Sequence, residues 1–177
     1  LRYHNLQHNT LAIDGQLQRV DGRANTIRVG DAKWPFATID LSPVYRGQAK
    51  RVDRGIRLPD ARTVEIDDAV LGVEPRAVLT WRMITDAEIE AASPQTLTLR
   101  KSGKTATLTV LSPADARFVH ALIDEKRRPF ESENPGASAI RLELTGRRDH
   151  DIVVRLTTAE AADPKRLDAA RPSAWRD

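Results

Sequence analysis

Short runs in which apolar and polar residues alternate recur along the chain, and Gly, Pro, Asp or Asn closes most of them. A period of two places successive side chains on opposite faces of a β-strand, so these runs predict half-buried strands. The run over 78–85, which contains Trp81 and Met83, is the clearest buried strand. Strands are predicted at 10–13, 24–29, 36–41, 44–57, 63–71, 78–85, 89–92, 96–100, 106–111, 118–123, 139–144 and 152–156.

Turn residues between these runs predict how the strands are connected. Asp14-Gly15 is a turn pair, and it predicts that 10–13 and 24–29 form an opening hairpin. Ser102-Gly103 predicts a second hairpin, between the strands that flank it. Asp67-Asp68 interrupts an apolar run and predicts a bulge or bend.

About a dozen strands with short connections, and no alternation with long helices, predict an all-β fold with at most short helices. The expected architecture is a two-layer antiparallel β-sandwich. A chain of 177 residues with 40% hydrophobic and 30% charged residues is long enough for one substantial core. Residues 1–157 are expected to form this sandwich, and 158–177 a tail that packs on it or extends from it.

Arginine dominates the positive charge of the chain. The net charge is only +3, but 22 of the 28 basic residues are arginine, whose planar fork matches carboxylates, sulfates and phosphates. No run of five basic residues is present and only 5% of residues are aromatic, so nucleic acid is not an expected partner. The sequence has no cysteine and no apolar stretch that predicts a membrane span.

Several motifs occur in the order found in one family of enzymes. The segment His8-Asn9-Thr10 with Asp14-Gly15 is the most specific of them. It resembles an element in the sandwich domain of the heparinase II/III-like polysaccharide lyases, and the resemblance extends from about Tyr3 to about Leu156. The other segments that resemble family elements are Asp40-Leu41-Ser42 with Tyr45, Arg54 with Asp67 or Asp68, Trp81 to Thr85, and Glu133 to Gly136.

This resemblance implies a bacterial lyase of two parts, an N-terminal α/α toroid and a C-terminal β-sandwich, located in the periplasm or cell envelope. Such enzymes cleave uronate-containing polysaccharides of the glycosaminoglycan or alginate type by β-elimination. The reaction needs a base, an acid and a group that neutralises the uronate carboxylate. The resemblance assigns the tyrosine and the neutralising group to the toroid, and a histidine to a segment preceding His8. No catalytic residue is therefore assigned here, and the isolated chain is expected to be inactive.

His8 is the candidate metal ligand, because the resemblance implies that the histidine of this segment helps to bind a divalent ion such as zinc or calcium. A structural zinc site needs about four ligands, so His8 alone does not form one. His4 and Asp14 are the other ligands that the sequence offers nearby. The alternative is that His8 and Asn9 only form hydrogen bonds within the sheet. No cofactor is expected in the isolated chain.

Candidate substrate-binding residues are Trp34, beside a proline in a predicted loop, and the arginines of the densest basic stretch. Alternate members of that stretch are expected to line one sheet face and to bind anions. The alternative is a solvated face with Arg54 paired to an aspartate. Asp67 and Asp68 are adjacent, so they are expected to point to opposite faces. The residues of the basic stretch are Arg46, Lys50, Arg51, Arg54 and Arg57.

Two functions remain open at this stage. The first is the sandwich domain of a polysaccharide lyase that contacts an acidic polysaccharide together with the toroid. The second is a non-catalytic module that binds acidic glycans or supports a neighbouring domain. The sequence contains neither a G-x-S-x-G nor an H-E-x-x-H motif, so it gives no support to hydrolase or zinc-protease functions.

Overall fold

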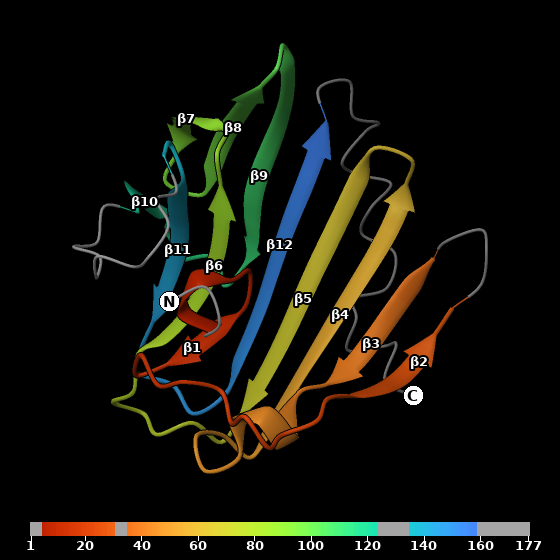
Figure 1. The fold of residues 1–177 in the computed structure, drawn as a ribbon, viewed down its shortest axis with the longest axis vertical. Helices are drawn as coiled ribbons and strands as arrows, with labels where there is room; N and C mark the ends of the chain where they lie inside the picture. Colours follow the sequence, from red (N-terminus) through yellow and green to blue (C-terminus); the bar gives the residue numbers. More distant parts are fainter. Residues whose placement is uncertain (1–4, 31–34, 124–134, 159–177) are drawn as a thin grey trace.

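The computed structural model describes residues 5–30, 35–123 and 135–158, which form two antiparallel sheets (Figure 1). The small sheet has the order β1-β6-β11-β10, and the large sheet the order β2-β3-β4-β5-β12-β9-β8-β7. The predicted two-layer all-β sandwich is confirmed. The elements are η1 (Asn5–Gln7), β1 (Leu11–Ile13), β2 (Asn25–Val29), β3 (Phe36–Asp40), η2 (Ser42–Tyr45), β4 (Arg51–Asp60), β5 (Thr63–Leu71), β6 (Leu79–Thr85), β7 (Glu88–Ser93), β8 (Thr96–Lys101), β9 (Lys104–Ser112), β10 (Val119–Leu122), β11 (Ser138–Leu144) and β12 (His150–Thr158).

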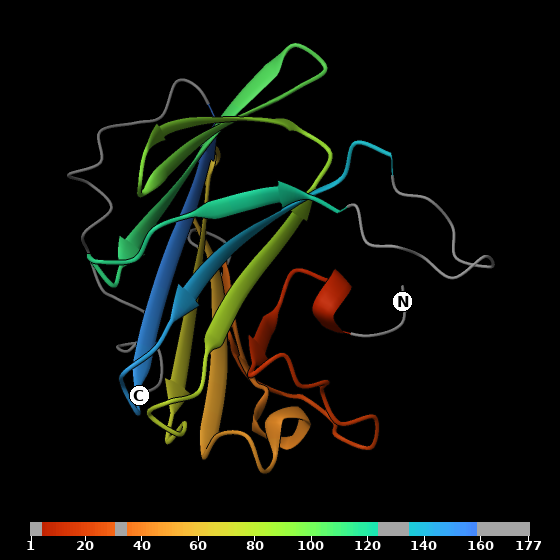
Figure 2. The same cartoon turned by 90° about the vertical axis from the view of Figure 1, so that its left-hand side faces the viewer.

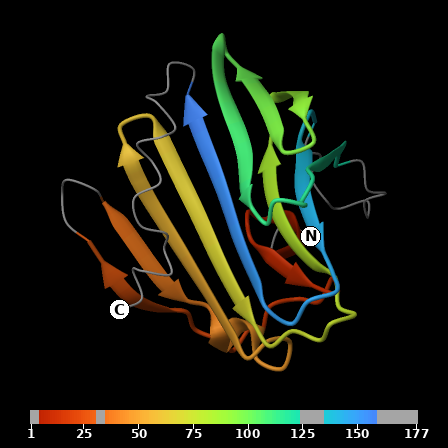
Figure 3. The ribbon, with the colours of Figure 1, turned by 180° about the vertical axis from the view of Figure 1, so that it is seen from behind.

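The large sheet is built around three long strands, β4, β5 and β12, and forms one continuous layer when seen from behind (Figure 3). Its register places Val52 opposite Val70 and Ile56 opposite Ile66. These apolar residues face the small sheet, because every second side chain of a strand shares a face. The β8–β9 hairpin turns at Ser102 and Gly103, both with positive φ, as the sequence predicts.

The core lies between the two sheets and contains side chains from both. Trp81 on β6 is 2% exposed, and its ring lies 6.4 Å from that of Phe118. The interpretation of Trp81 as a core residue rather than a sugar platform is therefore confirmed. Further buried residues of this cluster are Leu11, Val52, Val70, Leu79, Leu97, Leu108, Ile140, Leu142, Ile152 and Val154.

The predicted opening hairpin is wrong. β1 pairs with β6 in the small sheet, whereas β2 pairs with β3 in the large sheet. The Asp14-Gly15 turn does redirect the chain, but the Asp14 carboxylate accepts a hydrogen bond of 2.7 Å from the Val78 amide instead of closing a hairpin. The chain then crosses from one layer to the other (Figure 2). Local turn chemistry identified the turn, but not the sheet of the next strand.

Two details of the predicted strands are also wrong. The pairing of β5 with β4 and β12 continues through Asp67 and Asp68 without a shift, so this part of the strand has no bulge. The predicted strand 44–57 is instead η2 followed by β4, which continues through Pro59 to Asp60. Asp68 is tolerated within a regular, buried strand because Arg54 on β4 neutralises it.

The predicted tail lies almost entirely outside the described residues, which end at Thr158, the last residue of β12. The division at 157 therefore stays a prediction. Among the described residues, no helix is long and apolar enough to span a membrane.

Candidate functional site

Most of the motifs that carry the family resemblance meet at the open edge of the small sheet, where the segment 5–10 leads into β1. We call this group the polar cluster. It combines side chains from this segment, from the connection between β1 and β2, from η2 and from the inner face of the large sheet. Its members are Asn5, Asn9, Thr10, Gln18, Tyr45, Arg54 and Asp68.

A buried ion pair connects the large sheet to this segment. Arg54 Nε and Nη2 donate to the two carboxylate oxygens of Asp68 at 2.6 and 2.8 Å, and Nη1 donates to the Asn9 carbonyl at 2.9 Å. The Arg54 side chain is 12% exposed and that of Asp68 is fully buried. Burial alone would lower the pKa of Arg54, but the charge and hydrogen bonds of Asp68 outweigh this effect and raise it. The guanidinium therefore stays charged and holds the segment against β4.

Tyr45 occupies the centre of the polar cluster. Its hydroxyl donates to the Leu11 carbonyl at 2.8 Å and accepts from Gln18 Nε2 at 2.8 Å, and it lies 3.2 Å from Thr10 Oγ1. Tyr45 is 0% exposed, and burial raises the pKa of its phenol. A neutral phenol enclosed in this way positions β1, and it is inaccessible to a polysaccharide.

Asn9 and His8 have different environments although they are adjacent. Asn9 Oδ1 accepts a hydrogen bond of 2.8 Å from the Ile84 amide, so it joins the segment to β6. The interpretation that Asn9 forms hydrogen bonds within the sheet is therefore confirmed. The His8 backbone is held by its amide, which donates to the Asn5 carbonyl at 3.1 Å, while the residue is exposed. His8 is thus presented at the surface by a well-braced backbone.

The donors around His8 do not form a metal centre by themselves. No group of three His, Cys, Asp or Glu side chains with metal-binding geometry occurs within residues 5–30, 35–123 and 135–158. Asp14 is engaged by the Val78 amide, and Asp68 is enclosed with Arg54. His4 lies outside the described residues. A role of His8 as one ligand of a divalent ion stays a prediction that needs donors from elsewhere.

The predicted arginine stripe is divided between two faces of the large sheet. Arg51 lies on the outer face and contacts Asp53 at 2.7 Å, whereas Arg54 points inward to Asp68. Arg57 shares the outer face and contacts Glu65 at 2.6 Å. The pairing of Arg54 with an aspartate, which the alternative expects, is therefore confirmed, and alternate members of the stretch, Arg51 and Arg57, share one face. Anion binding by that face stays a prediction.

The remaining predicted substrate-binding residues are Arg46 and Trp34. Arg46 is exposed in the turn after η2, outside β4. Trp34 lies outside the described residues. Substrate contacts by Trp34, Arg46 and Arg51 stay predictions.

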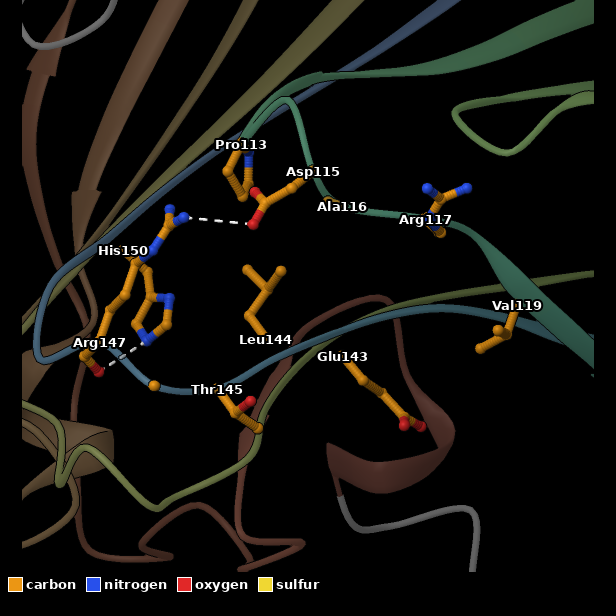
Figure 4. Close-up of a pocket in the computed structure, with 11 residues that line it drawn as sticks. Pro113, Asp115, Ala116, Arg117, Val119, Glu143, Leu144, Thr145, Arg147 and His150 are labelled. Carbon is orange, nitrogen blue, oxygen red and sulfur yellow. Dashed lines mark hydrogen bonds and ion pairs between the residues drawn. The ribbon is translucent and has the colours of Figure 1, made fainter.

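A second candidate site was not predicted from the sequence. A pocket lies between the connection from β9 to β10 and the turn from β11 to β12 (Figure 4). It is lined by Asp115, Arg117, Leu144, Arg147 and His150, among others. These residues come from segments far apart in the sequence, and no motif marks them. His120, the other described histidine besides His8 and His150, is exposed on β10 and does not line this pocket.

Comparisons with known proteins find similarity in structure but not in sequence. No family model matches the chain, and no curated protein matches it in sequence. The heparan sulfate lyase HepC from Pedobacter heparinus is similar in structure, with a TM-score of 0.69 and 13% identity over 89% of this chain. Two heparinase III structures have TM-scores of 0.66 and 0.64, with 12% and 8% identity over 92% and 87% of this chain.

The chain spans about a quarter of the length of these lyases, 25% for HepC and 25% and 24% for the two heparinase III structures. The likeness therefore concerns one domain of a larger fold. Nearly the whole chain is superposed at very low identity, which shows a shared architecture. The chain has the β-sandwich fold that forms part of heparinase III-type polysaccharide lyases.

Proposed function

We propose that this chain is the β-sandwich module of a bacterial polysaccharide lyase that acts on uronate-containing acidic polysaccharides by β-elimination. One observation carries the proposal: the segments that resemble lyase motifs, which are distant in sequence, converge in the polar cluster of a domain with the heparinase III sandwich fold. A sandwich that serves only as generic scaffolding does not require these residues to meet beside an exposed histidine.

The module contributes positioning rather than a complete reaction centre. β-Elimination needs a base for the proton alpha to the carboxylate, an acid for the leaving oxygen and neutralisation of the carboxylate. Tyr45 is enclosed, and Arg54 is committed to Asp68. His8 is the exposed titratable side chain of the segment, so we propose that it faces the polysaccharide.

The remaining catalytic groups are proposed to come from an α/α toroid of the same or parent polypeptide. Location in the periplasm or cell envelope belongs to this proposal, as does a divalent ion bound partly by His8. The described residues supply too few donors to hold such an ion, so no step of the reaction is assigned to it.

The test is a binding panel with the intact chain. Heparan sulfate, chondroitin sulfate and alginate are compared with neutral dextran by calorimetry at low and high salt. We expect binding of at least one uronate polymer that weakens as salt is added, because the contacts are electrostatic. Absence of binding to every acidic polymer, or equal binding of dextran, contradicts the proposal.

A further inference from the structure

The pocket beside His150 has the size and composition of a small ligand site. Its volume is about 390 Å³, near the lower end of the roughly 300–1,000 Å³ typical of small-molecule pockets. It shares no residue with the polar cluster. A space of this size is suited to one sugar ring, with the rest of a polymer continuing outside it.

His150 supplies an unused acceptor at the base of this pocket. It is 5% exposed, and Nε2 lies 3.1 Å from the Arg147 carbonyl, so Nε2 carries the hydrogen and Nδ1 keeps its lone pair. Burial lowers the pKa of His150, which favours this neutral form. Nδ1 is turned toward the pocket (Figure 4), and no side chain of the described residues donates to it.

Two arginines place positive charge at the rim. Arg147 Nη2 contacts Asp115 at 3.2 Å, with side chains 54% and 72% exposed. Such an exposed pair contributes little to stability and can exchange partners readily. Arg117 also lines the pocket, is exposed, and has no ion pair with a described residue. Counting only partners in the part of the chain that the structure describes, the pocket has one unpaired cation, Arg117, and one that is only weakly paired, Arg147.

The two carboxylates of the pocket are partly neutralised. Asp115 faces Arg147, and Glu143 lies 3.8 Å from Arg141 Nε. Between the charged groups, Leu144 forms an apolar surface that is 8% exposed (Figure 4). An apolar surface flanked by a hydrogen-bond acceptor and by cations is complementary to a sugar ring that has C–H groups, hydroxyls and an acidic group.

We propose that this pocket binds one acidic sugar residue, with a ligand hydroxyl donating to His150 Nδ1 and the acidic group on Arg117. The choice of an acidic sugar rests on the proposed function. The pocket adds a second contact for the polysaccharide, separate from the surface around His8. The charge of Arg117 fixes the ligand class: an anionic sugar pairs with it, and its neutral counterpart offers it no counter-charge.

The test uses the intact chain labelled with ¹⁵N and titrated with glucuronate, with glucose as the matched neutral sugar. We expect glucuronate to shift the amide signals of Thr145, Gly146 and His150, and glucose to have a much smaller effect. Arg117→Gln is expected to weaken glucuronate binding about fivefold or more, because a charge-assisted contact is lost. Arg76→Gln, an exposed arginine outside the pocket, is the control and leaves the affinity unchanged.

The possible outcomes distinguish the pocket proposal from the proposed function. Equal responses to glucose and glucuronate, or an Arg117→Gln variant with full affinity, overturn the recognition of the acidic group. If heparan sulfate binds the chain but glucuronate leaves the pocket signals unmoved, the pocket proposal fails and the proposed function stands. If glucuronate binds here and no acidic polymer binds the chain, the pocket is supported and the proposed function fails.

Discussion

The polar cluster and the pocket beside His150 differ in how completely their charged groups are paired within the protein. In the polar cluster, Arg54 makes two hydrogen bonds to a fully buried carboxylate and a third to a backbone carbonyl. In the pocket, Arg147 makes one exposed contact, and Arg117 has no ion pair with any described residue. The first arrangement satisfies its charges internally, whereas the second leaves hydrogen-bonding capacity for a ligand.

This difference suggests different roles: the polar cluster acts as a structural framework, and the pocket is open to a ligand. Groups whose hydrogen bonds are all made within the protein hold the backbone of the segment 5–10 and thereby fix where His8 is presented. Weakly paired, exposed charged groups lose little free energy when they give up their partner to bind an anion. Resemblance to a family motif therefore does not by itself identify ligand contacts. In this chain, motif residues such as Asn9, Tyr45 and Arg54 hold the backbone around His8.

The largest effect is expected from Asp68→Ala. Removing the carboxylate leaves the Arg54 guanidinium nearly buried without its counter-charge, which costs about 3–5 kcal/mol of unfolding free energy. Urea denaturation measures the change. Asp21→Ala removes the partner of Arg19 in an exposed pair and is the control, with no measurable loss expected. Similar stabilities of the two variants would contradict the framework role.

A smaller loss is expected from Tyr45→Phe. The ring stays in place, but the Leu11 carbonyl and Gln18 Nε2 lose their 2.8 Å bonds to the phenol and keep only 3.4 Å bonds, from Asn5 Nδ2 and to Thr10 Oγ1. The cost is about 1–2 kcal/mol, because two short hydrogen bonds at a buried position are lost and only longer ones remain. The substitution should increase the rate of amide hydrogen exchange more at β1 than at β12. Uniform acceleration across both sheets would show that Tyr45 stabilises the whole fold rather than this edge.

The pocket predicts a modest dependence of stability on pH. Burial lowers the pKa of His150 below its ordinary value of 6.5, so the unfolded chain binds a proton more readily than the folded chain. The contribution of His150 to stability is therefore complete above pH 6.5 and is lost as the pH falls through 6.5 toward the folded-state value. Urea midpoints across this range measure it.

The matched variants are His150→Gln, which should remove this part of the pH dependence, and His120→Gln, which should keep it because His120 is exposed. The comparison concerns the slope with pH, so a general loss of stability in either variant does not affect it. An unchanged slope in His150→Gln would show that the dependence arises from other groups.

The smallest effect on stability is expected from Asp115→Asn. Its pair with Arg147 is exposed, so the free energy of unfolding should change by no more than about 0.5–1 kcal/mol. Glucuronate affinity should rise, because a repelling carboxylate is removed and Arg147 is released. Calorimetric titration with glucuronate measures the affinity, and a decrease would mean that Asp115 itself contacts the sugar.

The sequence predicts what depends on local pattern. The run 63–71 coincides with β5, and the Ser102-Gly103 turn joins β8 to β9, because alternation and turn chemistry are local properties. The odd spacing of Arg51 and Arg54 implies opposite faces, and the even spacing of Arg51 and Arg57 implies a shared face, so strand parity predicts how the basic stretch divides. Arg54 and Asp68 fall opposite each other only after β4 and β5 take their register.

Long-range placement does not follow from local sequence patterns. The sheet that β1 joins depends on an edge of β6 formed by residues far along the chain. The pocket is missed for the same reason, because two distant connections form it and its chemistry depends on which His150 nitrogen faces inward. Motifs drew attention to Asn9, Thr10, Tyr45, Arg54 and Asp68, but not to their meeting in one cluster with Asn5 and Gln18. No pattern identifies the pocket.

The most direct test of the account is an elimination assay on the intact chain with the acidic polysaccharide that it binds most tightly, followed by the absorbance of unsaturated uronate. The account predicts binding without product, since the enclosed Tyr45 and the committed Arg54 leave the described residues without a complete reaction centre. Product that forms at a steady rate with the chain alone, and is lost in His8→Ala, would contradict it.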